Sequence, residues 1–339
     1  MRAVLLERFG LDGLREIRDA PEASAPAPGE VRVRLSAASL NYHDLATVLG
    51  MANPKMALPQ VPLSDGAGVV EAVGEGVTSL REGQRVTTSF FPAWQAGAPG
   101  LAKLRQVTGE TVPGAMQEYL VAPAAAFVPT PAHLSDIEAA TLPCAALTAW
   151  RAVVEEGQVR AGSRVLIQGT GGVSLFALQF AHMLGAETVV ISSSDEKLAL
   201  AEALGADHLI NYTAQPRWGR AVREACGGEG VDMVVEVGGA GTLPESLSAV
   251  TIGGHISMIG VLTGVASMVP TAKIMAMNVT VRGITVGHRE QFEAMNRAIT
   301  LQALRPVIGQ VFGFSELGKA LATMQAATHT GKLCIDFDR

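Results

Sequence analysis

The stretch Val165–Ala181, which reads VLIQGTGGVSLFALQFA, decides how this chain folds. A short apolar run ends at glycines 169, 171 and 172, and an amphipathic stretch of helical composition begins directly after them. Small residues between a strand and a helix let backbone N–H groups and the helix N-terminus face a pyrophosphate. The segment therefore predicts a dinucleotide-binding loop made by Gly169, Gly171, Gly172 and Val173.

One position departs from the usual glycine pattern of such loops. Ser174 stands where the third glycine is expected, so its side chain must fit where strand and helix pack most closely. A tight glycine turn with a purely structural role is the alternative interpretation.

The end of the next predicted strand indicates which dinucleotide is bound. A site for NAD expects an acidic residue about 20 positions further on, but this strand ends in Ser192, Ser193 and Ser194. An acid there would repel a 2′-phosphate by up to about 4 kcal/mol, whereas serine offers donors. Lys197 adds a charge-assisted contact, so NADPH is predicted over NADH. Alternatively, the serines only cap the next helix and Lys197 is a solvated surface residue.

Strands and helices alternate on both sides of this loop. Nearly continuous apolar strands in such an alternation imply a parallel sheet covered on both faces. A helix is expected over Asp136–Glu156, with Ser135 as its cap. The expected strands are Arg164–Gln168, Thr188–Ser192, His208–Ile210, Asp232–Val237, His255–Ile259 and Thr280–Val286, and the expected helices between them are Gly172–Leu184, Asp195–Leu204 and Thr242–Val250.

The first 125 residues have a different pattern. Apolar and polar residues alternate at Val31–Leu35, and similar runs recur at Gly68–Val73 and Gln117–Val121 with glycine turns between them. This indicates an all-β lobe, either a small antiparallel barrel or a sandwich. A helix near Gln291–Ala303 and a strand at Lys332–Phe337 end the chain and are expected to return to this lobe.

Composition limits the possible functions. Hydrophobic residues make up 48% of the 339 positions and charged residues 17%, which supplies core for two domains. The formal charge is −6 and no block of like charge occurs, so neither nucleic acid nor a membrane is an expected partner. Three cysteines, an odd number without a CxxC pair, favour a reducing, cytoplasmic location.

Several motifs in order resemble the medium-chain dehydrogenase/reductase superfamily. They are DGAGVVEAVGEGV at Asp65–Val77, GQRV at Gly83–Val86, AMQEY at Ala115–Tyr119 and the loop GTGGVS. The resemblance covers essentially the whole chain and is strongest to the zinc-free quinone-oxidoreductase-like and enone-reductase branches. It implies an α/β protein in which a GroES-like β-barrel lobe, residues 1–125 and 288–339, accompanies a Rossmann doubly wound parallel sheet at residues 126–287, with the active site in the cleft between them.

Zinc alcohol dehydrogenases of this superfamily hold a catalytic metal with a Cys, a His and a second Cys. The resemblance places Asn41, Ser64 and Cys144 at these positions, so one thiol remains of the three ligands. Catalytic zinc needs three protein ligands, and no metal is expected. His43 is interpreted as a structural residue or as one that contacts the site residues and not the substrate. An alcohol dehydrogenase with an atypical metal set around Cys144 and His43 is kept as an alternative.

Without a Lewis acid, the chemistry expected of the fold is hydride transfer to a carbon that is already electrophilic. The resemblance places Asn41 and Tyr42 at the floor of the active site, where a donor would hold the carbonyl oxygen of an enone, enal or quinone. Tyr42 is expected to act as a hydrogen-bond donor, or else to be a packed interface residue. Relatives carry another tyrosine where this chain has Gly50–Asn53, so the proton donor stays open.

The same resemblance assigns further contacts with the cofactor. It places Thr148 near the nicotinamide, Tyr212 near the adenosine phosphate and Gly260 on the ribose side, while Val286, Arg289 and Lys332 complete the cleft. For Lys332, a charge at a strand edge is the alternative. In the irregular stretch 90–114, Phe91, Trp94 and Leu101 are candidates for contacting substrate or a partner subunit.

The function predicted from the sequence is that of a cytoplasmic, zinc-independent, NADPH-dependent reductase of activated C=C bonds or quinones. The rival is a non-catalytic NADP-binding protein of the zeta-crystallin type. A homodimer is expected, formed by extension of the sheet at strand Thr280–Val286.

Overall fold

The computed structural model describes residues 1–339, which form two compact units. The first contains Met1–Leu147 and Gly287–Arg339, and the second contains Thr148–Val286. The sequence predicts an internal boundary after residue 125, whereas the structure includes residues 126–147 in the first unit. The reason is that helix α3 (Asp136–Ala139) contacts strands of the first unit's sheet.

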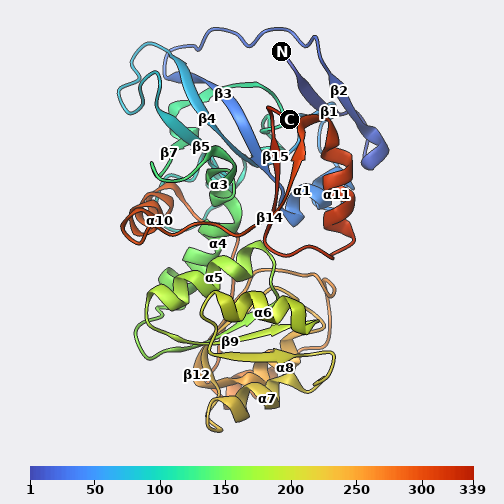
Figure 1. Cartoon of the computed structure of the whole chain (residues 1–339), viewed down its shortest axis with the longest axis vertical. Helices are drawn as coiled ribbons and strands as arrows, with labels where there is room; N and C mark the ends of the chain where they lie inside the picture. Colours follow the sequence, from blue (N-terminus) through green and yellow to red (C-terminus); the bar gives the residue numbers. More distant parts are fainter. The chain divides into compact units, whose positions relative to one another are not determined.

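The first unit is built on a seven-stranded sheet (Figure 1). The six strands along its path have the order β14-β15-β3-β4-β5-β7, and β6 pairs with β3 outside that path. The strands are β3 (Glu30–Ser39), β4 (Asp65–Val73), β5 (Arg85–Thr88), β6 (Tyr119–Pro123), β7 (Phe127–Pro129), β14 (Ile308–Gly313) and β15 (Lys332–Asp336), with a separate hairpin of β1 (Ala3–Leu6) and β2 (Leu14–Ile17).

The C-terminal strand joins the sheet far from its neighbours in sequence. β15 runs antiparallel to β3, with Cys334 opposite Ser39. This confirms the expected return of the chain's end to the first lobe. Short helices connect these strands: η1 (Leu11–Gly13), α1 (Tyr42–Val48), α2 (Leu101–Leu104), η2 (Ala124–Ala126), α10 (Arg289–Leu301), η5 (Phe314–Glu316) and α11 (Leu317–Gln325).

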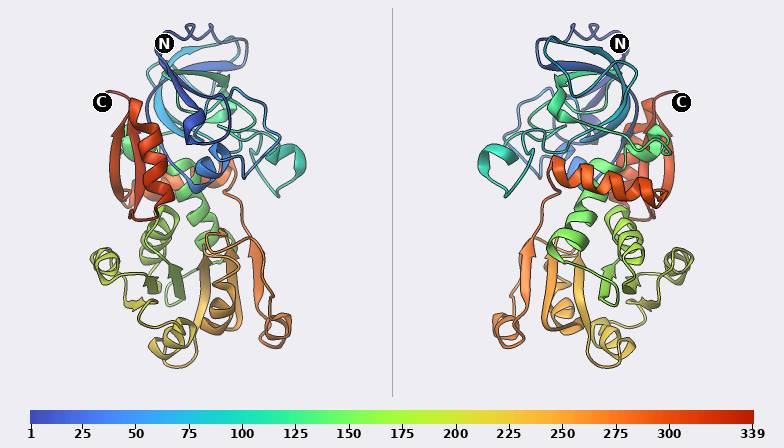
Figure 2. Two further views of the ribbon diagram at one scale, coloured as in Figure 1. Left: turned by 90° about the vertical axis from the view of Figure 1, so that its right-hand side faces the viewer. Right: turned by 90° about the vertical axis from the view of Figure 1, so that its left-hand side faces the viewer.

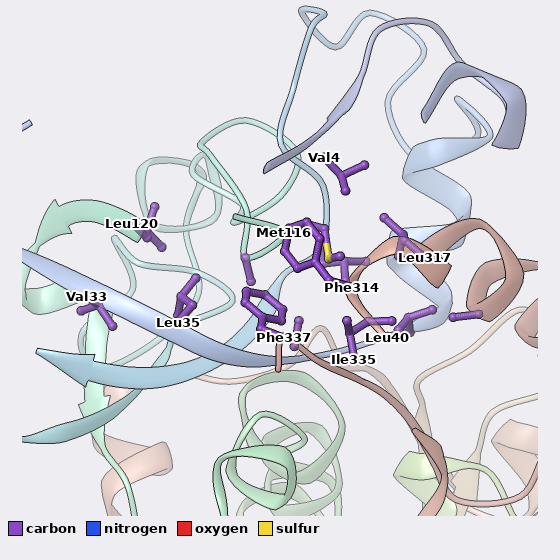
Figure 3. Close-up of a cluster of buried hydrophobic side chains, with 14 of the residues drawn as sticks. Val4, Val33, Leu35, Leu40, Met116, Leu120, Phe314, Leu317, Ile335 and Phe337 are labelled. Carbon is purple, nitrogen blue, oxygen red and sulfur yellow. The ribbon is translucent and has the colours of Figure 1, made fainter. Parts of the chain in front are cut away.

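A hydrophobic core holds this unit together (Figure 3). Val33 and Leu35 from β3 belong to the same cluster as Phe314, Ile335 and Phe337 from the end of the chain. The alternation of apolar and polar residues in β3 explains this packing, because alternate side chains of a strand point to the same face. The cluster therefore fixes β15, with Lys332 at its start, beside β3.

The second unit contains a six-stranded, all-parallel sheet. Its order is β10-β9-β8-β11-β12-β13, which is the order 3-2-1-4-5-6 of a Rossmann fold. The strands are β8 (Arg164–Gln168), β9 (Glu187–Ser192), β10 (His208–Asn211), β11 (Val231–Glu236), β12 (Val250–Met258) and β13 (Thr280–Gly283). The strand order reverses between β8 and β11, where ligands bind in folds of this kind.

Helices cover this sheet on both faces (Figure 2). α5 packs on β8 and β9, whereas α8 packs on β11 and β12. The helices of this unit are α4 (Leu147–Trp150, shared at the boundary), η4 (Arg151–Glu156), α5 (Gly172–Met183), α6 (Asp195–Ala203), α7 (Trp218–Ala225), α8 (Leu243–Ala249) and α9 (Thr271–Ala276). All the strands and helices expected around the glycine loop are present, with ends shifted by a few residues.

The segment Asp136–Glu156 is helical as expected, although not as one regular α-helix. It consists of α3, the π-helical turn η3 (Leu142–Ala146), α4 and the π-helical turn η4. Ser135 caps its start by accepting a hydrogen bond from the backbone N–H of Glu138. Its length and apolar composition would suffice to cross a membrane, but 78% of the apolar window is buried in the fold, as in a core helix.

Candidate active site and cofactor-binding loops

The glycine loop leaves open space above the N-terminus of α5. A Cβ atom added at Gly171, the N-cap of α5, would meet no atom within 4 Å. Gly169 has φ +75°, a conformation that favours glycine. The loop follows β8 at the reversal of strand order, and its backbone N–H groups lie at a helix N-terminus. This arrangement fits the pyrophosphate of a dinucleotide.

Ser174 fits the tight place where a third glycine was expected. Its hydroxyl donates a 2.6 Å hydrogen bond to the carbonyl oxygen of Gln168, and its side chain is buried. The serine thus ties the first turn of α5 to the end of β8, and the departure from the glycine pattern leaves the loop intact.

At the end of β9 the three serines have different roles. Ser192 is buried, Ser193 is half-buried, and Ser194 caps α6 through the backbone N–H of Lys197. Helix capping, the alternative interpretation of the three serines, therefore explains Ser194 but not Ser192 or Ser193. Ser192 pairs with Asn211 of β10, and Tyr212 follows with its side chain 39% exposed.

A buried glutamate that the sequence analysis did not single out organises the neighbouring loop. Glu236, at the end of β11, is fully buried. Its Oε1 accepts hydrogen bonds from the backbone N–H groups of Gly238 and Gly239 and from the Thr242 hydroxyl; its Oε2 accepts from Gln168 Nε2 and the Ser246 hydroxyl. Because Gln168 directly precedes Gly169, one carboxylate joins the two loops at the reversal of strand order. The signal in the sequence is a single acid that ends an apolar strand.

The other residues assigned to the cofactor lie in both units. In the second unit, Thr148 is buried in α4, and a Cβ at Gly260 would come within 2.2 Å of the Val237 carbonyl oxygen, so only glycine fits there. Val286, also buried, ends this unit with φ +39°.

In the first unit, Arg289 binds the Glu293 carboxylate and the carbonyl oxygens of Ala125 and Phe127. Its guanidinium thus anchors α10 to β7. The assignment of these residues to the cofactor stays a prediction.

The first unit holds a buried polar network around Asn41, which precedes α1. The ammonium of Lys332 donates to Asn41 Oδ1 and to the Leu40 carbonyl oxygen, both at 2.6 Å. Asn41 Nδ2 donates to Ser64 Oγ at 3.1 Å, and the Ser64 hydroxyl donates to Asp65 Oδ1 at 2.9 Å. A chain of hydrogen bonds thus runs from Lys332 to Asp65.

A second carboxylate holds the backbone of this network. Asp44 Oδ2 accepts from the Asn41 N–H and Oδ1 accepts from the Ser64 N–H, both at 2.8 Å. The Cys144 N–H donates to Asp65 Oδ2 at 3.2 Å. Two buried carboxylates therefore bring together Asn41, Ser64 and Cys144, the three positions at which the resemblance predicts metal ligands.

Burial shifts the pKa values of the two carboxyl groups, Asp44 and Asp65. Burial raises the pKa of Asp65 to about 7; the charge of Lys332 and the hydrogen bonds from Asn41 and Ser64 oppose this rise, and the charge of Asp44 adds to it. Burial also raises the pKa of Asp44, against the attraction of His43. Desolvation disfavours the ionised form of a carboxyl group.

His43 forms an ion pair that the sequence pattern does not predict. Its Nε2 lies 3.0 Å from Glu110 Oε2, and its ring packs edge-on against Phe90. Burial lowers the pKa of His43, but the contact with Glu110 and the charges of Asp44 and Asp65 raise it above its ordinary value. The contact with His43 in turn lowers the pKa of Glu110. His43 thus lies beside the network as expected, and the partner from the irregular stretch 90–114 was not foreseen because 67 positions separate the two residues.

Tyr42 and the aromatic residues of the stretch 90–114 lie in different environments. The Tyr42 side chain is 45% exposed. Phe91 and Trp94 are buried and contact each other, and Trp94 also contacts His288, so they pack within the first unit. Leu101, by contrast, is 94% exposed.

The residues at the metal positions do not fit a catalytic zinc ion. An amide at Asn41 and a hydroxyl at Ser64 replace two strong ligands, and the ammonium of Lys332 contacts that amide. No group of three or more His, Cys, Asp or Glu side chains in the structure is arranged to hold a metal.

Comparisons with known proteins agree with this architecture. Residues 27–132 match the family model of the alcohol dehydrogenase GroES-like domain, and residues 172–300 match the model described as zinc-binding dehydrogenase. A zinc-type alcohol dehydrogenase-like protein of Schizosaccharomyces pombe is 43% identical over 92% of both chains. The chain belongs to the medium-chain dehydrogenase/reductase superfamily, and its fold of a GroES-like domain with a parallel sheet is the one expected from the sequence.

Two further relatives place the chain within that superfamily. The human quinone oxidoreductase is 26% identical, covering 99% of this chain and 97% of its own. The crystal structure of an NAD-dependent alcohol dehydrogenase has a TM-score of 0.92 at 35% identity, covering 99% of this chain and 100% of its own. The protein is therefore an oxidoreductase of a family whose members bind a nicotinamide cofactor.

Proposed function

We propose that the protein is an NADPH-dependent reductase of activated C=C bonds, such as those of enones and enals, or of quinones, and that it works without zinc. The observation that carries this proposal is the network at the metal positions. Asn41 and Ser64 offer hydrogen-bonding groups there, and Lys332 adds a positive charge. A substrate that is already electrophilic needs hydrogen-bond donors and not a Lewis acid.

The second unit would bind the cofactor. The reduced nicotinamide supplies a hydride when bound. Gly169, Gly171 and the N-terminus of α5 would bind the pyrophosphate, while Ser192, Ser193 and Lys197 would contact the 2′-phosphate. The preference for NADPH rests on the absence of an acid at the end of β9.

The experiment that tests this function measures consumption of NADPH and NADH by the purified protein. Enones, quinones, aldehydes and simple alcohols are compared, each with and without a strong chelator. We expect NADPH-dependent turnover of enones or quinones that the chelator leaves unchanged. Alcohol oxidation that the chelator abolishes would contradict the proposal, and NADPH binding without any turnover would favour a non-catalytic NADP-binding protein.

We also propose a cytoplasmic homodimer. β13 forms the edge of the parallel sheet, and exposed apolar side chains lie in the preceding segment at Val265, Met268 and Met275. Pairing of two β13 strands would cover an edge that is otherwise open. Sedimentation velocity should give twice the monomer mass, and a monomer at micromolar concentration would reject this assembly.

A further inference from the structure

We propose that the ammonium of Lys332 is a catalytic group, which takes the place of the metal by holding the carbonyl oxygen of the substrate as negative charge develops on it. This inference rests on the proposed reductase function and names the group that stabilises its transition state.

The first argument is the position of the ammonium. Lys332 is only 4% exposed, and it contacts Asn41, which the sequence resemblance places at the first metal-ligand position. A cation therefore lies next to the place from which a metal would polarise oxygen. The core of the first unit fixes this position, because Leu333 and Ile335 of β15 are fully buried.

The second argument is the bonding of the ammonium. An ammonium group has three N–H donors, and carbonyl oxygens of Leu40 and Asn41 accept two of them. No carboxylate lies within ion-pair distance of Lys332: Asp44 and Asp65 act on it only at longer range. The positive charge is therefore not cancelled by a direct ion pair, and we assign the third N–H donor to the substrate oxygen.

The third argument is the chemistry. When a hydride adds to the β-carbon of an enone, the C4–H bond of the reduced nicotinamide breaks and a C–H bond forms at the β-carbon. The electron pair of the C=C bond then shifts to form the enolate double bond, and the π pair of the carbonyl moves onto its oxygen. The resulting enolate then takes a proton from water, so that NADPH, a proton and the enone become NADP⁺ and the saturated ketone. A buried ammonium beside that oxygen stabilises the enolate more than it stabilises the neutral enone, which lowers the barrier.

The sequence-based assignment gives Lys332 another role, contact with the cofactor. Binding the cofactor and stabilising the enolate both need a positive charge, but substitution of Lys332 would change a different measured constant in each case. A group that holds the cofactor affects its dissociation constant, whereas a group that stabilises the enolate affects kcat.

The experiment compares wild type with Lys332→Met and Lys332→Arg. Met is close to the lysine stem in size and removes the charge; Arg keeps it. Lys319→Met is the matched control, because the Lys319 side chain is 66% exposed and contacts only an ion-pair partner, Glu316, and the Phe312 ring, neither of which belongs to the network. Thermal unfolding is measured for all four proteins.

We expect Lys332→Met to lower kcat about 100-fold or more, the size found for loss of one oxyanion donor. The dissociation constant of NADPH should stay within about twofold, Lys332→Arg should recover part of kcat, and Lys319→Met should match wild type. A weakened NADPH affinity with unchanged kcat would overturn the proposal in favour of the cofactor role.

A second readout needs no turnover and also serves if the Met variant is unstable. 4-Nitrophenol, whose phenolate is yellow, mimics an enolate, and its ionisation is titrated while bound to the full-length protein with NADP⁺. The dye should ionise at lower pH on wild type and Lys332→Arg than in solution, and at higher pH on Lys332→Met. Identical titration on all three proteins, or no binding to wild type, would overturn the proposal. If wild type reduces no substrate of the panel but the dye still reports Lys332, the proposed substrate class fails and the oxyanion site stands.

Discussion

The ammonium of Lys332 lies 2.6 Å from the side-chain oxygen of Asn41, although 291 positions separate the two residues in the chain. β15 and β3 bring them together, since Lys332 begins β15 and Asn41 follows the end of β3, its antiparallel partner. The contact places the only lysine of the network beside the Asn41 amide, which the resemblance puts at a metal-ligand position. The polar network around Asn41 therefore forms only after the C-terminal strand β15, which carries Lys332, has paired with β3.

Gly171→Val should abolish tight cofactor binding without unfolding the protein. A side chain there meets no atom within 4 Å, and φ at Gly171 is −78°, so the fold tolerates it, but it would fill the space above α5. We expect the NADPH dissociation constant to rise at least about tenfold, measured by fluorescence titration. Gly100→Val is the control: its surroundings are equally open, it precedes the exposed α2, and its affinity should be that of wild type.

Ser193→Asp should weaken NADPH binding more than NADH binding. The added carboxylate would repel the 2′-phosphate, with an upper limit of about 4 kcal/mol. Ser193→Asn, which adds similar volume without charge, should keep the preference. The ratio of kcat/KM for the two cofactors measures the effect, and an unchanged ratio in the Asp variant would place the 2′-phosphate elsewhere.

Glu236→Ala should strongly destabilise the second unit. It would remove the shared acceptor of five donors. The Gly238 N–H and the Thr242 hydroxyl have second acceptors, in Gln168 Oε1 and the Gly239 carbonyl oxygen, whereas the Gly239 N–H, Gln168 Nε2 and the Ser246 hydroxyl would each lose a buried hydrogen bond. Each buried unsatisfied polar group costs about 1–3 kcal/mol, so we expect a loss of at least about 3 kcal/mol in chemical denaturation. Glu229→Ala, which removes an exposed partner of Arg164, should cost less than about 1 kcal/mol.

Asp65 should make folding stability fall as pH rises. Its pKa is about 7 in the folded protein against an ordinary value of 3.8, so the folded state binds its proton more tightly. This contribution is complete below pH 3.8 and is lost as pH rises to about 7, a change of about 4 kcal/mol. The stability difference between wild type and Asp65→Asn, measured by denaturation from pH 4 to 8, should therefore decrease with pH. A difference independent of pH would contradict the prediction.

Cys334 should resist thiol reagents in the native protein. Burial raises its pKa to about 12, and its side chain is fully covered between β3 and α3. Cys226 is also buried with a raised pKa, whereas Cys144 is partly accessible. Mass spectrometry after brief treatment with iodoacetamide should find label on Cys144 first, because reaction requires an accessible thiolate. Early label on Cys334 would mean that β15 opens readily.

Local patterns in the sequence were sufficient for much of this structure. The glycine loop, the alternation of strands and helices and the period of two in β3 predicted both units, because hydrophobic periodicity and turn residues act over a few neighbouring positions. The resemblance also predicts that Asn41, Ser64 and Cys144 stand at the metal positions. It could not show that Ser174 binds the Gln168 carbonyl or that residues 126–147 join the first unit.

Only the tertiary structure decided which charged groups act together. Lys332 with Asn41, His43 with Glu110, and Glu236 with Gln168 are far apart in sequence and become neighbours through strand pairing and loop packing. The sequence by itself determined that the chain has a dinucleotide-binding fold and that Asn41 and Ser64 stand at the positions where the resemblance predicts zinc ligands. The charge that lies beside the vacated ligand positions, and the burial that shifts the pKa of Asp65, depend on three-dimensional proximity and desolvation, which no local pattern records.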